Sequence, residues 1–419
     1  DSANVVYAAL DNVYRIKQAG LDSVSFFPTG ATPFLLTAAD LNADSIADIV
    51  AANVGAQSVQ VMLNGSLGAN FTSTSYSTGA EPTVLGTADL EGDGDVDVIV
   101  GNRLQQTIAI LFNDSTGAYP TSTEIFVGRA VTELVLADLD TDQDTDIAVT
   151  DDVTGTISVY LNDGLGSFGA PKLITGPAAP SAMIAGDFTK NGITDLLVAS
   201  STANTVTLMQ NLGNATVQIG TPIALAGTPG RMKRGDFDID GDLDFAVSQA
   251  DRTVRIWKNQ GTGTFGDSAS VATADTVNSM VAVDMDEDGY LDLVTPLGNG
   301  DITVLINDAN GVFTDSVVID NQAGIGVAVA GDLNGDSLAD LALARPSDNG
   351  LLFYSMPVPQ NIKPPAPPRD LVAADSQSDL GGRNTLTWRR PNVDKTTGRL
   401  TRYRVMRATS MAGPYTQLA

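Results

Sequence analysis

The stretch Asp138-Leu-Asp140-Thr-Asp142-Gln-Asp144-Thr-Asp146 is one of seven copies of a nine-residue acidic phrase in this chain of 419 residues. The copies begin at Asp40, Asp89, Asp138, Asp187, Asp236, Asp284 and Asp332, so successive starts lie 49 or 48 residues apart. A fixed period of this length is typical of repeat architectures, in which each unit packs against its neighbours. The spacing therefore predicts one large repeat array.

Each unit around the phrase contains four short runs of strand-forming residues. In the second unit these runs cover residues 81–90, 96–101, 106–113 and 124–127, and Gly, Asn, Asp or Pro separates them. Short Val-, Ile- and Thr-rich runs between turn residues predict β-strands, and helical periodicity is absent. Four antiparallel strands repeated radially form the blades of a β-propeller. We therefore predict an all-β, seven-bladed β-propeller of four-stranded antiparallel blades.

The seventh unit lacks a fourth strand after residues 351–356. Residues 12–17 and 23–27 resemble the third and fourth strands of a unit. We expect an N-terminal strand to complete the last blade, because closure of the ring removes an exposed sheet edge. Residues 5–10 have no place in this scheme, and an eighth, irregular blade remains an alternative.

The third run of most units ends in Asn, and Phe or Tyr follows six or seven residues later. The pairs are Asn64 and Phe71, Asn113 and Tyr119, Asn162 and Phe168, Asn259 and Phe265, and Asn307 and Phe313. Asn is typical of tight turns. We expect the aromatic side chain to pack between blades.

The acidic phrase has the spacing of a calcium loop. Side-chain oxygens fall at positions 1, 3, 5 and 9, and the backbone carbonyl at position 7 adds another, which suits the six to eight oxygens that Ca²⁺ takes. An EF-hand is excluded because its closing Glu at position 12 is missing and the chain continues as a strand. The alternative is a set of solvated acidic turns without metal. Seven in-phase copies favour up to seven bound Ca²⁺ ions.

The predicted ligands occupy positions 1, 3, 5, 7 and 9 of each loop. They are Asp40, Asn42, Asp44, Ile46 and Asp48; Asp89, Glu91, Asp93, Asp95 and Asp97; Asp138, Asp140, Asp142, Asp144 and Asp146; Asp187, Thr189, Asn191, Ile193 and Asp195; Asp236, Asp238, Asp240, Asp242 and Asp244; Asp284, Asp286, Asp288, Tyr290 and Asp292; and Asp332, Asn334, Asp336, Leu338 and Asp340. The loop at 187–195 offers only two ligand carboxylates and is expected to bind most weakly.

Composition excludes several classes of function. The chain has 50 acidic and 23 basic residues, no His and no Cys, and a formal net charge of −27. Nucleic acid is therefore not an expected partner, since phosphate binding needs a basic surface. No run of about 18 apolar residues occurs, so no direct membrane span is expected. Without an imidazole base or a thiolate nucleophile, we predict no enzymatic activity.

The charge changes sign near the C-terminus. Residues 363–419 carry 10 Lys/Arg and 4 Asp/Glu, and they begin with Lys363-Pro-Pro-Ala-Pro-Pro368. Such a shift beside a Pro-rich stretch predicts a domain boundary. The expected domains are a propeller over 1–360, a linker over 361–368 and a further module over 369–419.

The phrase Asp-x-[Asp/Asn]-x-Asp-Gly-x-x-Asp between apolar strands resembles the FG-GAP repeat of integrin α-subunit propellers and the related VCBS repeat of bacterial surface proteins. Phe168-Gly-Ala-Pro171 resembles part of the motif that names the first family. The resemblance covers residues 23–356 and implies a calcium-bearing propeller with the loop residues above as ligands. Because Cys and His are absent, we expect an exported bacterial protein, either secreted or at the cell surface.

The C-terminal segment resembles the first half of a fibronectin type III domain, which is a β-sandwich. Residues 368–374 are similar to its first strand, Trp388 to the core Trp of its second strand, and Tyr403 to the Tyr of its third strand. The resemblance implies a partial sandwich at the C-terminus. Further modules of the same polypeptide are expected to follow it.

Five arginines are predicted to lie on the propeller face opposite the acidic loops: Arg103, Arg129, Arg231, Arg252 and Arg345. They would form a surface for an anionic ligand, either an acidic glycan or an acidic protein patch. The alternative is that they are scattered solubilising side chains.

The predicted function is that of a non-catalytic, calcium-stabilised propeller in an exported bacterial multi-module surface protein. Its role would be adhesion, ligand binding or extracellular assembly. Two alternatives remain. One is a carbohydrate-active enzyme, resembling polysaccharide lyases, on a propeller scaffold. The other is a structural subunit of an extracellular filament or layer.

Overall fold

The computed structural model describes residues 5–9, 23–65, 70–286, 288–307, 311–321, 324–336 and 338–355, and the short segments 369–375, 384–389, 403–408 and 415–417. The chain divides into two compact units. One contains residues 20–356, and the second contains residues 1–19 and 357–419. No helix among the described residues is long and apolar enough to span a membrane.

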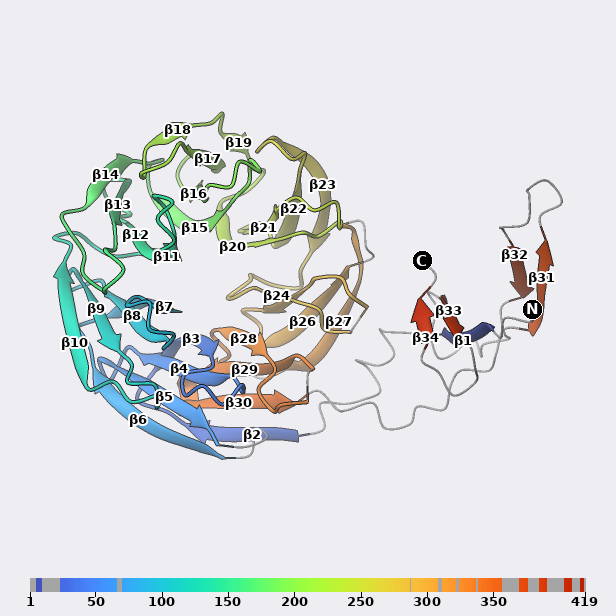
Figure 1. Ribbon diagram of the computed structural model, residues 1–419, viewed down its shortest axis with the longest axis horizontal. Coiled ribbons are helices and arrows are strands. Elements are labelled where there is room, and N and C mark those ends of the chain that lie inside the picture. The colour runs from blue at the N-terminus through green and yellow to red at the C-terminus, as the bar shows by residue number, and fades with distance from the viewer. Residues whose placement is uncertain are drawn as a thin grey trace. The chain divides into compact units, whose positions relative to one another are not determined.

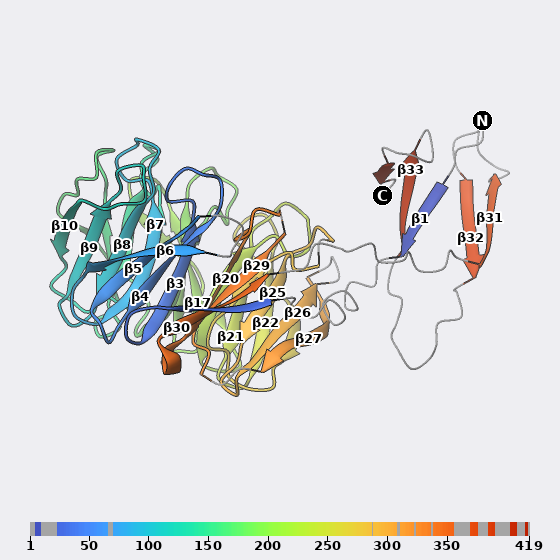
Figure 2. The same cartoon turned by 90° about the horizontal axis from the view of Figure 1, so that it is seen from below.

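The larger unit is a ring of seven antiparallel sheets (Figure 1), and Figure 2 shows the same ring turned by 90°. The first three blades are β3–β6 (Pro33–Ala39, Asp48–Asn53, Ser58–Asn64, Phe71–Ser77), β7–β10 (Pro82–Ala88, Asp97–Asn102, Thr107–Phe112, Thr121–Phe126) and β11–β14 (Glu133–Ala137, Asp146–Thr150, Thr156–Tyr160, Lys172–Thr175). The next three are β15–β18 (Pro180–Gly186, Asp195–Ser200, Thr205–Asn211, Val217–Ile219) with β19 (Ile223–Ala224) also on β17, β20–β23 (Pro229–Gly235, Asp244–Gln249, Thr253–Asn259, Phe265–Ala272) and β24–β27 (Val281–Val283, Asp292–Pro296, Asp301–Asn307, Phe313–Asn321). The prediction of seven four-stranded antiparallel blades is confirmed.

The seventh blade is assembled from both ends of the ring. Its strand order is β2 (Ser23–Pro28), β30 (Gly350–Ser355), β29 (Asp340–Arg345) and β28 (Ala328–Gly331), with a short 3₁₀ turn, η1 (Pro346–Asp348), between β29 and β30. The predicted closure by an N-terminal strand is therefore confirmed. Residues 12–17, predicted as a third-strand equivalent, lie outside the described residues.

The smaller unit contains two small sheets among its described residues. β1 (Val5–Ala9) pairs with β33 (Tyr403–Ala408), which also pairs with β34 (Tyr415–Gln417), while β31 (Arg369–Asp375) pairs with β32 (Asn384–Arg389). The described residues thus show neither the predicted fibronectin-like sandwich nor an eighth blade, because β1 pairs with β33 instead. The predicted linker at 361–368 lies outside the described residues.

The hydrophobic core lies between neighbouring blades. The second strands are completely buried, as in β4, β8, β16 and β21, whereas the fourth strands β6 and β10 are mostly exposed. A blade cannot bury both of its faces alone, so each face must pack on a neighbour.

The predicted aromatic residues pack between blades, as expected. Phe313 of the sixth blade meets Phe237 of the fifth, with ring centroids 6.0 Å apart, and Phe265 meets Phe188 of the fourth blade at 5.9 Å. Phe71 of the first blade contacts Phe27 of the closing strand at 4.7 Å. These edge-on contacts suit the charge distribution of aromatic rings.

The Asn at the end of the third strand has a role beyond the turn predicted for it. The Nδ2 of Asn113 donates to the carbonyl of Leu41 in the preceding blade at 2.8 Å and to the carbonyl of Val96 in its own blade at 3.0 Å. The bond to the preceding blade recurs from Asn162 to Leu90, Asn211 to Leu139, Asn259 to Phe188, Asn307 to Phe237, and Asn64 to Leu333. The last of these crosses the junction between the seventh and first blades. We call this set the asparagine clamp.

Replacing Asn113 with Ala should lower the free energy of unfolding by about 2–4 kcal/mol, because two buried carbonyls lose their donors. Chemical denaturation followed by intrinsic fluorescence measures the change. Asn70→Ala is the matched control, since Asn70 is exposed and its side chain makes no hydrogen bond among the described residues. A loss in Asn113→Ala no larger than in the control would show that the clamp does not hold the ring.

Candidate metal centres

All seven acidic loops join the first strand of a blade to the second. They therefore lie on one face of the ring, and the turns between second and third strands lie on the other. This placement follows from the alternating direction of antiparallel strands. The seven candidate sites thus form a circle on a single face.

Each loop is curled by its own side chains. In the second loop, Asp89 Oδ2 accepts from the amide of Gly94 at 2.9 Å, and Asp93 Oδ1 accepts from the amide of Asp95 at 3.0 Å. The turn requires a positive φ at position 6, which is +92° at Gly94 and +79° at Gln143. Glycine adopts this conformation without strain, so Gln143 is the costlier solution.

The residue at position 7 has the same role in every loop. Its amide donates to the side chain at position 5, at distances from 2.8 to 3.0 Å. The donors are Ile46, Asp95, Asp144, Ile193, Asp242, Tyr290 and Leu338. The side chain at position 5 is thereby held inside the loop.

The Asp at position 9 is a buried anchor. Asp97 is 2% exposed, and its Oδ2 accepts from the amide of Leu90 while its Oδ1 accepts from the amide of Asn113, both at 2.9 Å. The same pair of bonds holds Asp48, Asp146, Asp244 and Asp292. This residue therefore joins the loop to the end of the third strand.

Burial raises the pKa values of these anchors. Desolvation brings the pKa to about 6 for Asp97, about 7 for Asp244 and about 8 for Asp292, although the backbone amides oppose the shift. Neighbouring loop carboxylates add to the rise, since like charges disfavour ionisation. A bound cation would favour the ionised form of each group.

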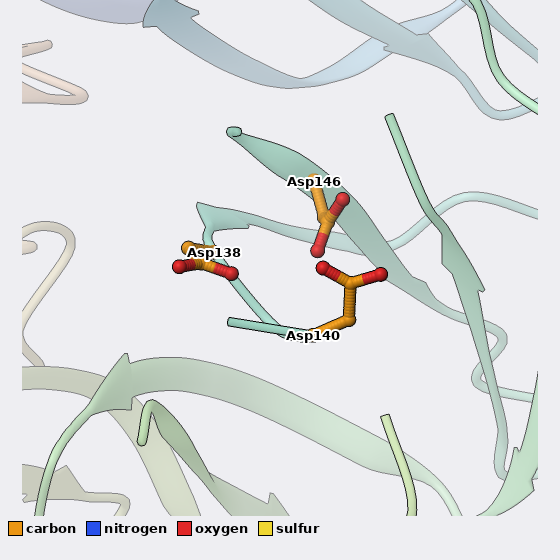
Figure 3. Close-up of side chains that lie close together, drawn as sticks. All are labelled: Asp138, Asp140 and Asp146. Carbon is orange, nitrogen blue, oxygen red and sulfur yellow. The ribbon is translucent and has the colours of Figure 1, made fainter. Parts of the chain in front are cut away.

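Three loops bring carboxylates together closely enough to hold one ion. One oxygen from each member lies within 4.8 Å of the others in the groups Asp138, Asp140 and Asp146; Asp236, Asp238 and Asp240; and Asp284, Asp286 and Asp292. Figure 3 shows Asp140 and Asp146 facing each other, with Asp138 beside them. The buried Oδ1 atoms of Asp140 and Asp236 have no hydrogen-bond partner in the described structure. Converging, unsatisfied carboxylate oxygens fit a hard divalent cation.

The fourth loop, at 187–195, differs from the others. Thr189 Oγ1 donates to Asp195 Oδ2 at 3.0 Å, so the anchor carboxylate is satisfied within the protein. Lys190, at position 4, forms an ion pair with Asp242 of the fifth loop, and Lys258 lies 3.2 Å from Asp238. Neither lysine was singled out from the sequence. Lys190 lies inside an acidic phrase, and its positive charge there was a signal in the sequence.

The loops at both ends of the array also depart from the three clusters. In the seventh loop, Asn334 turns its amide nitrogen toward Asp336 and Asp340, at 3.0 and 3.3 Å. In the first loop, Asn42 Oδ1 accepts from the amide of Asp44 at 3.1 Å. An amide at position 3 thus takes part in the loop's own hydrogen bonds.

Four of the five predicted surface arginines are paired with aspartates. Arg103 lies 2.9 Å from Asp152, Arg129 lies 3.7 Å from Asp151, Arg252 lies 3.5 Å from Asp275, and Arg345 pairs with Asp348. The Arg103 pair joins the second blade to the third. Arg231 instead donates from Nε to the carbonyl of Asn278 at 2.9 Å. The anionic-ligand surface stays a prediction, and any ligand there would compete with these aspartates.

In chelator at pH 8, Asp97→Asn should lower the free energy of unfolding by about 2 kcal/mol or more, because an amide has one acceptor oxygen for two buried N–H donors. Asp93→Asn is the matched control in the same loop. Asp93 is exposed and its single accepted bond can be kept by an amide oxygen. Equal losses in the two variants, measured by urea denaturation, would contradict the anchoring role of position 9.

Comparison with known proteins agrees with this geometry. Residues 40–100, 138–198 and 236–295 match the model of the FG-GAP-like repeat. No curated protein matches the chain. Among solved structures, BBS1N in complex with ARL6DN, soaked with mercury, has a TM-score of 0.59 at 14% identity and covers 86% of this chain and 100% of that one. The lead-soaked form of the same complex has a TM-score of 0.58 at 16% identity, with 80% and 95% covered.

A third similar structure is an Agrocybe aegerita lectin, described as recognising non-reducing terminal N-acetylglucosamine. Its TM-score is 0.54 at 18% identity, and the match covers 75% of this chain and 85% of the lectin. At these identities the likeness concerns the fold. The three repeat matches, the seven blades and the acidic loops together show FG-GAP-like repeats in the larger unit, which forms a seven-bladed β-propeller.

Proposed function

We propose that this chain is a non-catalytic, calcium-stabilised binding module of an exported bacterial surface protein. The observation that carries the proposal is that six of the acidic loops supply the carbonyl that the asparagine clamp of the following blade binds. The amide of Leu90 donates to the anchor Asp97 of its own loop, and its carbonyl accepts from Asn162 of the next blade at 2.8 Å. Ordering one loop therefore orders the junction between two blades.

Calcium is the cation that best suits these loops. Their donors are carboxylate, amide and carbonyl oxygens, which hard cations prefer, and the curled loops are open on one face. Oxygen loops of extracellular modules bind Ca²⁺ with dissociation constants of roughly 0.1–1 mM, which suits an exported protein. The residues would hold the ion, and the ion would remove the mutual repulsion of the carboxylates.

A binding role is favoured over catalysis by where the acids lie. Most clustered aspartates belong to the loops or to ion pairs between blades, and no His or Cys is present to supply an imidazole base or a thiolate. The similar solved structures are described as a lectin and as BBS1N in complex with ARL6DN. These descriptions concern those proteins, and they support recognition as a use of this scaffold.

The face opposite the loops is the proposed recognition surface. Leu104, Phe126 and Val153 are 72%, 74% and 83% exposed at strand ends and turns of the second and third blades on that face. Arg103 and Arg129 lie in neighbouring turns. Exposed apolar side chains beside arginines favour an acidic glycan or an acidic protein patch as the ligand.

Calcium at ten times its dissociation constant should stabilise the propeller by about 1.4 kcal/mol for each independent site. Asp140→Asn should remove one bound ion and reduce the rise in Tm. Calorimetric melting and equilibrium dialysis measure these effects. Asp251→Asn, which removes the same charge from the opposite face, is the control. A Tm and an ion count that do not respond to Ca²⁺ in the unaltered chain would refute calcium stabilisation.

A glycan-array scan in millimolar Ca²⁺, repeated in chelator, tests the recognition surface. We expect calcium-dependent binding to acidic glycans that Leu104→Ser weakens and Leu165→Ser leaves unchanged. Leu165 is the matched control because it is equally exposed, at 72%, on the face of the acidic loops. A blank array from folded protein would exclude the glycan ligand, and cleavage of a bound polysaccharide would favour the lyase alternative.

A further inference from the structure

The first strands of all seven blades enclose a cavity of about 480 Å³ on the axis of the ring. This volume lies within the usual range of small-molecule sites. The lining combines polar and apolar side chains, and Phe34, Leu134 and Ile184 are apolar lining residues that are not fully buried. None of the lining residues belongs to the acidic loops, and of the five predicted surface arginines the lining includes Arg231.

Three charged side chains line this axial cavity: Glu133 of β11, and Arg231 and Lys233 of β20. They break the repeat. Five residues before the loop, where Glu133 and Arg231 lie, the other blades carry Leu35, Val84, Ala182, Ser279 and Val327. Three residues before the loop, the equivalents of Lys233 are Thr37, Gly86, Val135, Ile184, Val281 and Val329. Departures from an otherwise consistent pattern are expected at functional positions.

The three charges are held on paired strands but do not neutralise one another. Glu133 pairs with Thr150 and Lys233 with Ala246 in the sheet registers, and Arg231 is fixed through its Nε bond to Asn278. Among the described residues, the side chains of Glu133 and Lys233 make no hydrogen bond, and Glu133 forms no ion pair within 4.0 Å with Arg231 or Lys233. A gap thus separates the acid from the two cations.

Enclosure makes these charges costly without a ligand. Glu133 is partly exposed and Lys233 is exposed to the cavity, yet protein surrounds both. Desolvation raises the pKa of Glu133 to about 7, although Arg231 and Lys233 oppose the rise, and it lowers the pKa of Lys233. With Glu133 ionised, the charged lining residues sum to +1, in a chain of net charge −27. An anion would relieve this imbalance.

We propose that the axial cavity binds a small organic carboxylate with an apolar body. Lys233 and Arg231 hold the carboxylate as charge-assisted donors, which are the strongest hydrogen-bonding groups available to it. The apolar body lies against Phe34, Leu134 and Ile184, the apolar lining residues that are not fully buried. Glu133 faces both cations and competes with the ligand when it is ionised.

The competition gives the site a dependence on pH. In the part of the chain that the structure describes, the charged groups that line the cavity with Glu133 are Arg231 and Lys233. Protonation of Glu133 below pH 7 leaves both cations to the ligand, so binding strengthens from pH 8 to pH 6. Glu133→Gln should bind more tightly than the unaltered chain at pH 8 and should show little change with pH.

Titration calorimetry of the full chain in millimolar Ca²⁺ tests the proposal with hexanoate, acetate and hexanol as probes. We expect hexanoate to bind more tightly than acetate, and hexanol to bind at least about tenfold more weakly than hexanoate. Lys233→Met should weaken hexanoate binding by about tenfold or more. Lys172→Met is the control, because Lys172 lies on the outer strand β14 and donates to Asn214.

The possible outcomes separate clearly. Tightening in Glu133→Gln with loss in Lys233→Met would support the site. Equal binding of hexanoate and acetate would show that the site binds the carboxylate group alone. It would overturn the proposal that the cavity also binds an apolar body. No binding, or binding that Lys233→Met and Lys172→Met change equally, would overturn the proposal. Unchanged melting curves of the variants would establish that folding is not the cause.

Discussion

The structure depends on one buried carboxylate in each blade, the Asp at position 9 of the acidic loop. In the second blade, Asp97 accepts two backbone N–H groups, one from Leu90 in its loop and one from Asn113 at the end of the third strand. The side chain of Asn113 then reaches the carbonyl of Leu41 in the preceding blade. One group thus connects the loop, three strands of the blade and the neighbouring blade. Burying this carboxylate without hydrogen-bond donors would destabilise the fold, because an unpaired buried charge costs several kcal/mol of folding free energy.

The same arrangement concentrates negative charge on one face of the ring. Burial, together with the neighbouring charges of Asp288 and Asp284, raises the pKa of Asp286 to about 7. A cation relieves this repulsion. The chain supplies a positive charge from the fourth loop, which has the fewest ligand carboxylates. Lys190 of the fourth loop pairs with Asp242 of the fifth. The fourth loop thereby contributes a positive charge to the acidic loop of the fifth blade.

Sequence patterns predicted the blades, the closure by β2 and the circle of acidic loops, because these features depend on short-range alternation and a fixed period. They did not predict the asparagine clamp across blades, since the acceptor of Asn162 lies 72 residues away and is a backbone carbonyl that any residue carries. The pairing of Arg103 with Asp152 was missed for a related reason. Both residues lie in turns, where sequence indicates exposure but not which turn is adjacent. The axial charges were visible as departures from the repeat, yet only the ring brings β11 and β20 to one cavity.

A ring of seven blades has seven junctions between neighbouring blades. A junction with fewer hydrogen bonds than the others is a weaker point of the ring. Six junctions carry an Asn donor, whereas the sequence of the seventh unit has Met356 in place of the Asn, and Met has no side-chain amide. Among the residues that the structure describes, no such bond crosses the junction between the sixth and seventh blades. The seventh blade is also the one that β2 completes without covalent continuity. The seventh blade thus combines a junction without a clamp bond and a strand that is not covalently continuous with the others. We therefore expect the ring to open first at this blade, because it is held by fewer hydrogen bonds than the clamped junctions.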